Sequence, residues 1–516
     1  MGIERELKLV APRDVLLRLV EAPVIEAQAA GPARAQSLES TYFDTDEEEL
    51  RGHALALRVR RVDGRFVQTL KAGAGMVRGE WESEVAGLVP DLDVLKGQVD
   101  GVPLDGVRVG DLRPVFATSV ERTCRELVVA DGNGAMAWIE VALDLGEVEA
   151  GGRRLDVAEL ELELKAGEPS ALFRLALALQ AEAPLRLETL SKAARGWLLA
   201  EGTPPPYQKA AKLELAPDVC LEDAMAAIFG ACLAHFEANV ATARDGREIE
   251  GVHQLRVSLR RLRSAFSTFK AVLPQAQVTT FKDEMRWVLE SLGRARDLDV
   301  LKEQILAPVI AQRPADAGLK RLTAALEAAR AEAYGAVRQM LDAPRCSRLQ
   351  LELAAWIAEA GWRNGVDEAA RGSQDGPLAG FARHLLDGRF KAARKKGRDL
   401  RKLEAAERHK LRIALKKLRY AAEFFQSLYE KKAAKQALKT LSGLQDGLGA
   451  MNDLRTAETL MEGTAPARPA RGRGGGAALA HAKGLIVGWH GAQLAAGEEA
   501  AATLWRDFAK GKPFWH

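Results

Sequence analysis

The chain has 516 residues, which is too long for a single hydrophobic core, so we expect two or more domains. Its 47% hydrophobic and 28% charged residues are typical of a soluble globular protein, and the net charge of +3 excludes a chain that is basic throughout. Four cysteines without a Cys-x-x-Cys pair argue against a disulfide framework or a zinc knuckle. With neither a signal-like N-terminus nor a run of about 18 apolar residues, we expect a cytoplasmic protein without a membrane partner.

The first 200 residues alternate between charged and aliphatic side chains with the period of a β-strand. The chain begins with Glu4-Arg5-Glu6-Leu7-Lys8, which places both acids and the lysine on one face. Further strands are predicted at residues 41–44, 55–62, 66–71, 80–85, 137–145 and 159–165. Turns such as Asp63-Gly64 separate them, and residues 171–180 are predicted to form a helix.

Two of these strands carry rows of carboxylates. Glu4 and Glu6 lie on one face of the first strand, and Glu159, Glu161 and Glu163 lie on one face of the strand near residue 160. An enclosed sheet face cannot hold two such rows unless cations accompany them. Since Mg²⁺ and Mn²⁺ prefer carboxylate oxygens, the pattern predicts a metal-dependent enzyme.

Basic side chains follow the same alternation. Arg58 and Arg60 share one strand face, and Lys71, Arg122 and Lys192 lie in or near neighbouring strands. One interpretation is an ordinary sheet with surface ion pairs, which is the better explanation for any single strand. The joint pattern favours a barrel with a polar lumen, in which bases hold phosphate oxygens and acids hold divalent cations.

The second half of the chain differs in texture. Thr203-Pro204-Pro205-Pro206 interrupts the strand pattern as a linker would, and long Ala/Leu/Arg/Glu stretches with helical spacing follow from about residue 218. The run His253 to Arg263 recurs as His409 to Arg419, 156 residues later, and Leu292 to Leu298 recurs as Leu448 to Leu454 at the same offset. A constant offset over some 45 residues predicts a duplicated helical unit.

Each copy carries a basic stripe beside its apolar seam. In the first copy His253, Arg256, Arg260 and Arg263 fall on one helical face. Around the second copy, residues 391–419 hold 13 Lys or Arg against three acids. A charge run is most often a solvated face, but its duplication favours binding of a polyanion. Without interleaved aromatics or a reading helix, nucleic acid is not the expected ligand.

The front half resembles the CYTH superfamily of triphosphate tunnel metalloenzymes. Glu4-x-Glu6-x-Lys8 is similar to the family signature, and Tyr42-Phe43-Asp44-Thr45, Leu55 to Arg60, Gln68 to Lys71, Glu159 to Lys165 and Leu190-Ser191-Lys192 resemble it in order. The resemblance implies an eight-stranded antiparallel tunnel that hydrolyses triphosphates with Mg²⁺ or Mn²⁺. The metal ligands that it implies are Glu4, Glu6, Asp144, Glu159, Glu161 and Glu163. The triphosphate-binding residues are Lys8, Arg58, Arg60, Lys71, Arg122, Arg125 and Lys192, and the catalytic candidates are Glu6, Glu163 and Lys8.

The back half resembles the CHAD domain, a duplicated helical module that is often fused behind a CYTH domain. The resemblance implies binding of inorganic polyphosphate, and a location at polyphosphate granules within the cytoplasm is one option. The implied polyphosphate-binding residues are His253, Arg256, Arg260, Arg263, His409, Arg412, Lys416 and Arg419. The insert at 465–476 departs from the family pattern and is predicted to form a loop.

The sequence thus predicts a two-domain α+β protein. An eight-stranded antiparallel β tunnel with flanking helices is expected at 1–202, a linker at 203–217, and an all-α duplicated bundle at 218–511, with repeats at about 218–345 and 376–511. The predicted activity is metal-dependent hydrolysis of inorganic triphosphate to pyrophosphate and phosphate, with polyphosphate as a partner of the helical domain. The alternatives are a hydrolase or cyclase for an organic triphosphate, and a non-catalytic polyphosphate-binding protein.

Overall fold

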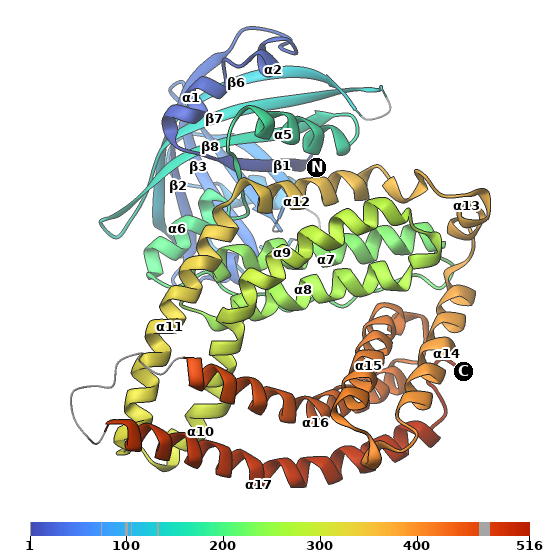
Figure 1. Cartoon of the computed structure of the whole chain (residues 1–516). Coiled ribbons are helices and arrows are strands. Elements are labelled where there is room, and N and C mark those ends of the chain that lie inside the picture. The colour runs from blue at the N-terminus through green and yellow to red at the C-terminus, as the bar shows by residue number, and fades with distance from the viewer. Residues whose placement is uncertain (1, 74, 99–101, 105, 132–133, 464–474) are drawn as a thin grey trace. The chain divides into compact units, whose positions relative to one another are not determined.

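The computed structural model describes the chain except for residues 1, 74, 99–101, 105, 132–133 and 464–474 (Figure 1). The chain divides into two compact units that interleave in sequence. The first unit comprises residues 1–207, 240–248 and 341–361, and the second comprises 208–239, 249–340 and 362–516. Residues 203–219 between them contain neither helix nor strand. The predicted loop at 465–476 lies almost wholly outside the described residues.

The first unit is built on a closed antiparallel barrel. Its strands are β1 (Gly2–Val10), β2 (Arg34–Thr45), β3 (Leu55–Val62), β4 (Arg65–Ala72), β5 (Val77–Val85), β6 (Leu112–Ala130), β7 (Met136–Ala150) and β8 (Arg153–Ala166). They are ordered β5-β4-β3-β2-β6-β7-β8-β1, and pairing of β1 with β5 closes the barrel. A short strand, β9 (Arg186–Glu188), pairs with the second half of β1. The prediction of an eight-stranded antiparallel tunnel is confirmed.

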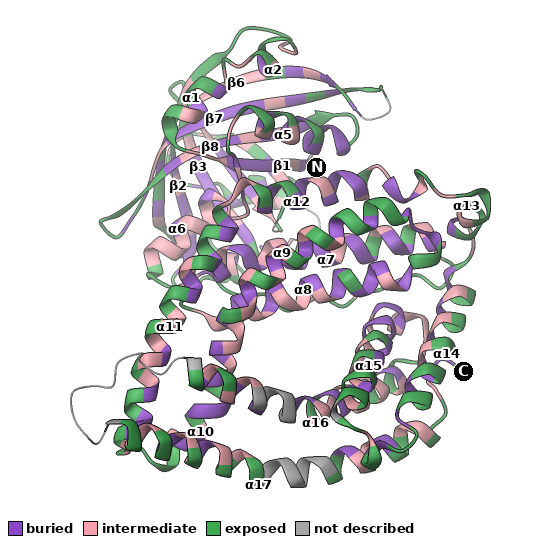
Figure 2. Ribbon diagram, in the orientation of Figure 1, coloured by how far each residue is buried: buried purple, intermediate pink, exposed green. Residues whose placement is uncertain are grey.

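The strand alternation explains why the barrel closes around charged side chains. On β1, Leu7 and Leu9 are fully buried outside the lumen, whereas Glu4, Glu6 and Lys8 point into it. Aliphatic side chains on the outer faces of β3 and β4 pack in the same way beneath helices and loops. Figure 2 shows the resulting buried bands along the strands. Burying these outer faces stabilises the unit and leaves the inner faces free to carry charge.

Short helices cover parts of the barrel. They are α1 (Arg13–Leu19), α2 (Pro23–Glu26), α3 (Glu49–Gly52), α4 (Leu92–Gln98), α5 (Ser170–Glu182) and α6 (Lys192–Glu201), with α12 (Pro344–Ala358) contributed by a distant part of the sequence. Ser191 caps α6 by accepting a hydrogen bond from the Ala194 amide, so the helix begins with Lys192. The predicted helix at 171–180 corresponds to α5.

The second unit is helical among its described residues, as predicted. Its longer helices are α7 (Leu221–Asp245, whose last turns belong to the first unit), α8 (Ile249–Thr268), α9 (Gln275–Val300), α11 (Ala317–Asp342), α14 (Leu378–Lys396), α15 (Ala405–Phe425), α16 (Lys431–Gly463) and α17 (Gly475–Lys510). The shorter ones are α10 (Ala307–Gln312), α13 (Glu368–Gln374) and a π-helix at Leu301–Leu306. By length and composition α7 could cross a bilayer, but 56% of its apolar window is buried, and a core helix passes the same test.

The predicted duplication is visible in side-chain packing. Arg256 on α8 lies over Gly293 on α9, where an added Cβ would be 3.7 Å from its guanidinium. At the offset of the repeat, Arg412 on α15 lies over Gly449 on α16, with the corresponding distance 3.1 Å. The equivalent arginine therefore lies over the equivalent glycine in both copies, at ordinary contact distance at Gly293 and more closely at Gly449.

Candidate active site

The barrel lumen contains a cavity of about 260 Å³, to which all eight barrel strands and the start of α6 contribute side chains. Its lining is dominated by charge. The carboxylates are Glu4, Glu6, Glu80, Glu82, Glu140, Glu161 and Glu163. The cations are Lys8, Arg58, Arg60, Lys71, Arg78, Arg122, Lys165 and Lys192.

Strand register brings the acids of β1 and β8 together. Glu6 lies opposite Glu163, and Lys8 lies opposite Glu161, in an antiparallel pair. The Lys8 ammonium donates to Glu6 and lies 3.5 Å from Glu161. The two predicted acidic rows therefore face each other across neighbouring strands, with a lysine between them.

The Glu6 and Glu161 carboxyl groups act on each other's ionisation. Burial, followed by the negative charge of Glu161, raises the pKa of Glu6 to about 7. Burial also opposes ionisation of Glu161, but Lys192, Lys8 and Arg122 outweigh it and lower its pKa well below the usual range. Two carboxyls this close cannot both ionise without a further cation between them.

Glu4 is held by two cations from β4 and β5. Lys71 donates to both oxygens of Glu4 at 2.7 and 2.9 Å, and Arg78 lies 3.4 Å from Glu4 and 2.5 Å from Glu6. Burial raises the pKa of Glu4, but Lys71 and Arg78 reverse that effect and lower it to about 2. Arg78 is not among the predicted site residues. It lies two residues before Glu80 on the same strand, so the strand alternation places both side chains on one face and could have identified Arg78 as a site residue.

Glu163 lies at a more open part of the lumen with Lys165 and Glu140. Glu140 and Glu163 are direct cross-strand partners, a repulsive pairing that the Lys165 ammonium relieves at 3.5 and 2.7 Å. Burial raises the pKa of Glu163, and the charges of Glu4 and Glu140 add to the effect. This carboxyl is 25% exposed.

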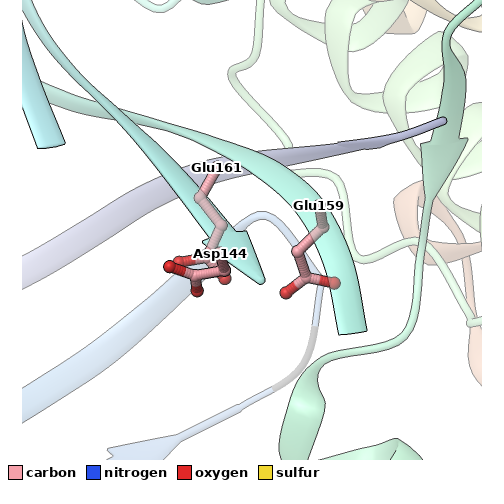
Figure 3. A group of neighbouring side chains, drawn as sticks. All are labelled: Asp144, Glu159 and Glu161. Carbon is pink, nitrogen blue, oxygen red and sulfur yellow. The ribbon is translucent and has the colours of Figure 1, made fainter. Parts of the chain in front are cut away.

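Three predicted metal ligands form a tight cluster at the inner end of the site. Potential ligand atoms of Asp144, Glu159 and Glu161 lie within 4.8 Å of one another (Figure 3). Lys192 contacts all three, at 2.5 Å from Asp144 and 2.9 Å from Glu161. Arg122 makes a two-pronged contact with Asp144. Asp144 and Glu159 are fully buried and do not line the cavity, because these protein cations cover them.

Arg60 differs from the other cations of the lumen. Its Nε donates to the Ser40 hydroxyl at 3.2 Å, and it forms no ion pair with any acid in the described part of the chain. Burial and the neighbouring charges of Arg58 and Arg122 lower the pKa of Arg60 to about 10. An unpaired, desolvated guanidinium beside two others attracts an anion into the lumen.

Tyr42 also lines the cavity. Its ring stacks on Phe116 with centroids 4.5 Å apart, and its hydroxyl forms a hydrogen bond with Arg58. Burial opposes ionisation of this phenol, but the positive charges of Arg58 and Arg60 prevail and lower its pKa. It was part of the motif that carries the family resemblance but not of the predicted site.

Six of the seven predicted triphosphate-binding residues line the cavity: Lys8, Arg58, Arg60, Lys71, Arg122 and Lys192. The placement predicted for Arg125 is wrong. Residues 122 and 125 lie on opposite faces of β6, because three residues along a strand reverse the face. Arg125 pairs instead with Glu26 on α2.

In the second unit, the predicted stripe residues lie along α8 and α15. His253, Arg256 and Arg260 are half-buried, whereas Arg263 and His409 are exposed. Burial and the charge of Arg296, the largest electrostatic contribution, lower the pKa of His253 to about 4. The Arg256 guanidinium donates to the Leu289 carbonyl at 3.1 Å. Arg412, Lys416 and Arg419 are half-buried on α15.

Comparisons with known proteins agree with this division. Residues 2–197 match the CYTH domain family, and residues 227–462 match the CHAD domain family. An inorganic triphosphatase from Haemophilus influenzae is 30% identical over 165 residues, which are 31% of this chain. The matched region spans 46% of that relative, about half its length.

One solved structure agrees with the match to the CHAD family. The CHAD domain from the plant Ricinus communis is similar with a TM-score of 0.50 and 33% identity, over 60% of this chain and 98% of that one. PptA from Streptomyces chartreusis matches with a TM-score of 0.41 and 19% identity, over 57% of this chain and all of that one. The chain therefore joins a member of the CYTH family, at residues 2–197, to a member of the CHAD family, at residues 227–462.

Proposed function

We propose that the barrel hydrolyses inorganic triphosphate to pyrophosphate and orthophosphate with Mg²⁺ or Mn²⁺, and that the helical unit binds inorganic polyphosphate. The closed lumen, where seven carboxylates and eight cations from seven of the barrel strands and from α6 converge, is the observation that carries the proposal. A phosphate chain needs cations along its length, and divalent metals need carboxylates. Family membership and the related triphosphatase support the same chemistry.

The size and lining of the lumen favour an inorganic substrate. The cavity of about 260 Å³ lies below the range of roughly 300–1,000 Å³ that is usual for organic ligands. Tyr42 is the one aromatic ring among the described lining residues, and Phe116 stacks on it. A nucleobase would find little apolar surface here, whereas a compact polyanion would meet charge on every wall.

The carboxylates fit a divalent cation. The negative charge of Glu161 raises the pKa of Glu6, and a metal ion bound to both carboxylates would relieve this repulsion. Glu4 and Glu163 lie on the same strands and can complete an oxygen ligand set, whereas Asp144 and Glu159 are already covered by Lys192, Arg122 and Arg195. A bound Mg²⁺ or Mn²⁺ would supply charge neutralisation and a more acidic water.

The remaining residues divide between binding and proton transfer. Arg60, Arg58 and Arg122 would hold phosphate oxygens, since Arg60 has no described acidic partner and the other two flank it. Lys8 would neutralise charge beside Glu6. Glu163 is our candidate for accepting a proton from the attacking water, because its pKa is raised and its carboxyl reaches solvent.

Phosphate release from a panel of substrates tests the proposal. Triphosphate, tetraphosphate, pyrophosphate and ATP would be incubated with the full chain in Mg²⁺, Mn²⁺ or EDTA, and the products separated. We expect equimolar orthophosphate and pyrophosphate from triphosphate, and none in EDTA. Faster turnover of ATP would favour an organic triphosphate, and no release from any substrate would refute catalysis.

Polyphosphate binding by the helical unit rests on its excess of cations. Arg256 and its repeat equivalent Arg412 each lie over a glycine of the neighbouring helix, and residues 391–419 add a dense basic segment. A polyanion that neutralises such a surface gains affinity from counterion release, so its binding must weaken with salt.

A further inference from the structure

The two repeats meet at two equivalent junctions between α8 and α15, and one of them is closed by an acid. Glu423 on α15 accepts hydrogen bonds from Arg261 of the first repeat at 3.1 Å and from Arg419 of the second at 3.0 Å. We call Arg261, Arg419 and Glu423 the closed junction. One carboxylate there compensates two guanidinium groups and ties the repeats together.

The residues of the other junction correspond to those of the closed junction when the repeat offset of 156 is applied. Lys417 corresponds to Arg261, Arg263 corresponds to Arg419, and Ser267 stands where the closed junction has Glu423. Both cations are kept, but the acid that compensates them is replaced by a neutral side chain. The duplication has therefore produced one junction with its counter-charge and one without it.

The second junction has also gained cations. Lys270 and Lys282 occupy positions where the second repeat has the neutral Gln426 and Leu438. Burial lowers the pKa of Lys282, and the charges of Lys270, Arg263 and Lys417 lower it further, so each of these three groups lies close enough to repel the Lys282 ammonium.

A fifth cation contacts the same two helices, α8 and α15. Arg389 on α14 donates to the Lys417 carbonyl at 2.5 Å and to the Thr268 hydroxyl at 3.0 Å. Burial lowers the pKa of this guanidinium to about 10. We call Arg263, Lys270, Lys282, Arg389 and Lys417 the open junction, and in the structure as described none of the five pairs with an acid.

Such a cluster costs stability in the free protein, because like charges repel around Lys282 and because Lys282 and Arg389 are half-buried, although Arg263, Lys270 and Lys417 are exposed. Five elements nevertheless hold it in place: α8, the turn that follows it, α9, α14 and α15. A phosphate group offers several negative oxygens to donors that arrive from different directions, which is the arrangement these side chains present.

We propose that the open junction binds one phosphate group of a condensed phosphate chain, so that a single chain is held by both repeats at once. The inference rests on the proposed binding of polyphosphate by the helical unit. Arg263 ends the stripe of the first repeat, and Lys417 adjoins Lys416 in the stripe of the second. A polyphosphate chain that is anchored between the two stripes binds the second stripe intramolecularly. This raises the affinity of the chain for the protein through a higher effective concentration.

The sharpest test copies the closed junction into the open one. The substitution Ser267→Glu restores the missing carboxylate at a half-buried position, and Ser373→Glu on the exposed face of α13 adds the same charge elsewhere. Binding of polyphosphate of about 100 units would be measured against salt in the full chain, together with the unfolding midpoint of the free protein. We expect Ser267→Glu to raise the unfolding midpoint, because the new carboxylate compensates the cations of the junction. Binding of polyphosphate should weaken about tenfold or more, because the junction would no longer hold the chain between the two repeats.

A second variant guards against a folding defect. Lys282→Gln removes one repelling cation, with Lys320→Gln on the exposed face of α11 as the matched loss of charge. Lys282→Gln should also raise the midpoint while lowering the salt slope by about 0.7, and the control should do neither. Triphosphate turnover should stay unchanged in all four variants.

The outcomes separate the possible failures. If the unaltered protein does not retain polyphosphate, the proposed function of the helical unit fails. If it does, and Ser267→Glu and Lys282→Gln bind with unaltered affinity and salt slope, the open junction is not part of the site. Orthophosphate that protects the protein as well as the long chain does, or two chains bound per molecule, would overturn the single-chain proposal in favour of a small-anion site.

Discussion

The barrel lumen and the helical repeats both concentrate cations, but they compensate them differently. In the lumen nearly every lining cation contacts a carboxylate, and Arg60 is the exception. At the open junction of the repeats, no described acid pairs with the cations. Acids of the protein itself therefore compensate most of the cations in the lumen, whereas the described part of the open junction leaves its cations without a paired acid.

The largest expected effect comes from breaking the carboxyl pair of the lumen. Glu6→Gln keeps the shape of the side chain but removes a metal ligand, so triphosphate turnover should fall by about 10³-fold or more. Phosphate release in saturating Mn²⁺ would measure it. Glu84→Gln on β5 is the control, because Glu84 pairs with Arg65 at the exposed end of the strand. Activity of Glu6→Gln close to that of the unaltered protein would contradict the metal assignment.

A smaller loss should distinguish two arginines of the barrel. Arg78→Gln removes the cation that holds Glu4 and Glu6 in position, and we expect about a 100-fold loss in kcat/KM. Arg125→Gln changes a residue that pairs with Glu26 outside the lumen, so its kinetics should stay within about twofold. Steady-state kinetics of both variants would measure this difference. Equal losses in kcat/KM would mean that the strand face on which an arginine lies does not determine whether it contributes to the site.

The helical unit should respond to salt rather than through catalysis. Changing Arg256, Arg260, Arg412 and Lys416 together to Ala should lower the salt slope of polyphosphate binding by about 3, at about 0.7 per cation. Triphosphate turnover should be unaffected, because these residues belong to the other unit.

A charge-matched control makes the stripe prediction specific. Four exposed lysines outside the stripes can be changed to Ala instead: Lys209, Lys212, Lys320 and Lys512. Binding titrations at several salt concentrations would compare the two quadruple variants. Equal slopes would show that only net charge matters.

The smallest effect concerns pH. His253 has a pKa of about 4 in the folded chain, below its ordinary value near 6.5, because burial and Arg296 oppose its charge. The unfolded chain therefore binds more protons between these values, and stability is present above about pH 6.5 and lost as the pH falls toward 4. Because the side chain is partly solvated, the loss should be on the order of 1 kcal/mol.

Urea unfolding at pH 7 and pH 4.5 would measure this contribution. In His253→Gln the difference between the two pH values should shrink, while exposed His409, changed in the same way, should leave it unaltered. The groups that act on His253 are Arg296, Glu250, Arg260 and Arg256. An unchanged pH dependence in His253→Gln would show that the imidazole is not held neutral.

Strand parity accounts for what could be predicted of the lumen. The alternation of β1, β3 and β8 placed Glu4, Arg58 and Glu161 inside the barrel, because the period of a strand fixes which face each residue takes. The same rule, applied to β6, excludes Arg125. Strand parity does not predict contacts between separate elements. The sequence therefore does not reveal that Lys192 from α6 covers Asp144 and Glu159.

In the helical half, the offset of the repeats could be predicted from the sequence, but the contacts between the two repeats could not. Glu423 lies outside the matched motif, and its role appears only when Arg261 and Arg419 are seen to converge on it. The contrast with Ser267 follows from combining that contact with the offset. Helical periodicity assigns a face to each residue but does not say which helix the face meets.

The interleaved first unit has a practical consequence for dissecting this protein. Its α12 comes from residues 344–358, where Ser347 accepts a hydrogen bond from the Leu187 amide of β9 and Glu359, just beyond the helix, binds Arg174 of α5. A fragment cut at residue 202 would lose both partners and expose the side of α5 and β9 that α12 covers. We therefore expect a truncation at this boundary to destabilise the first unit, so that point variants of the intact polypeptide give the clearer test.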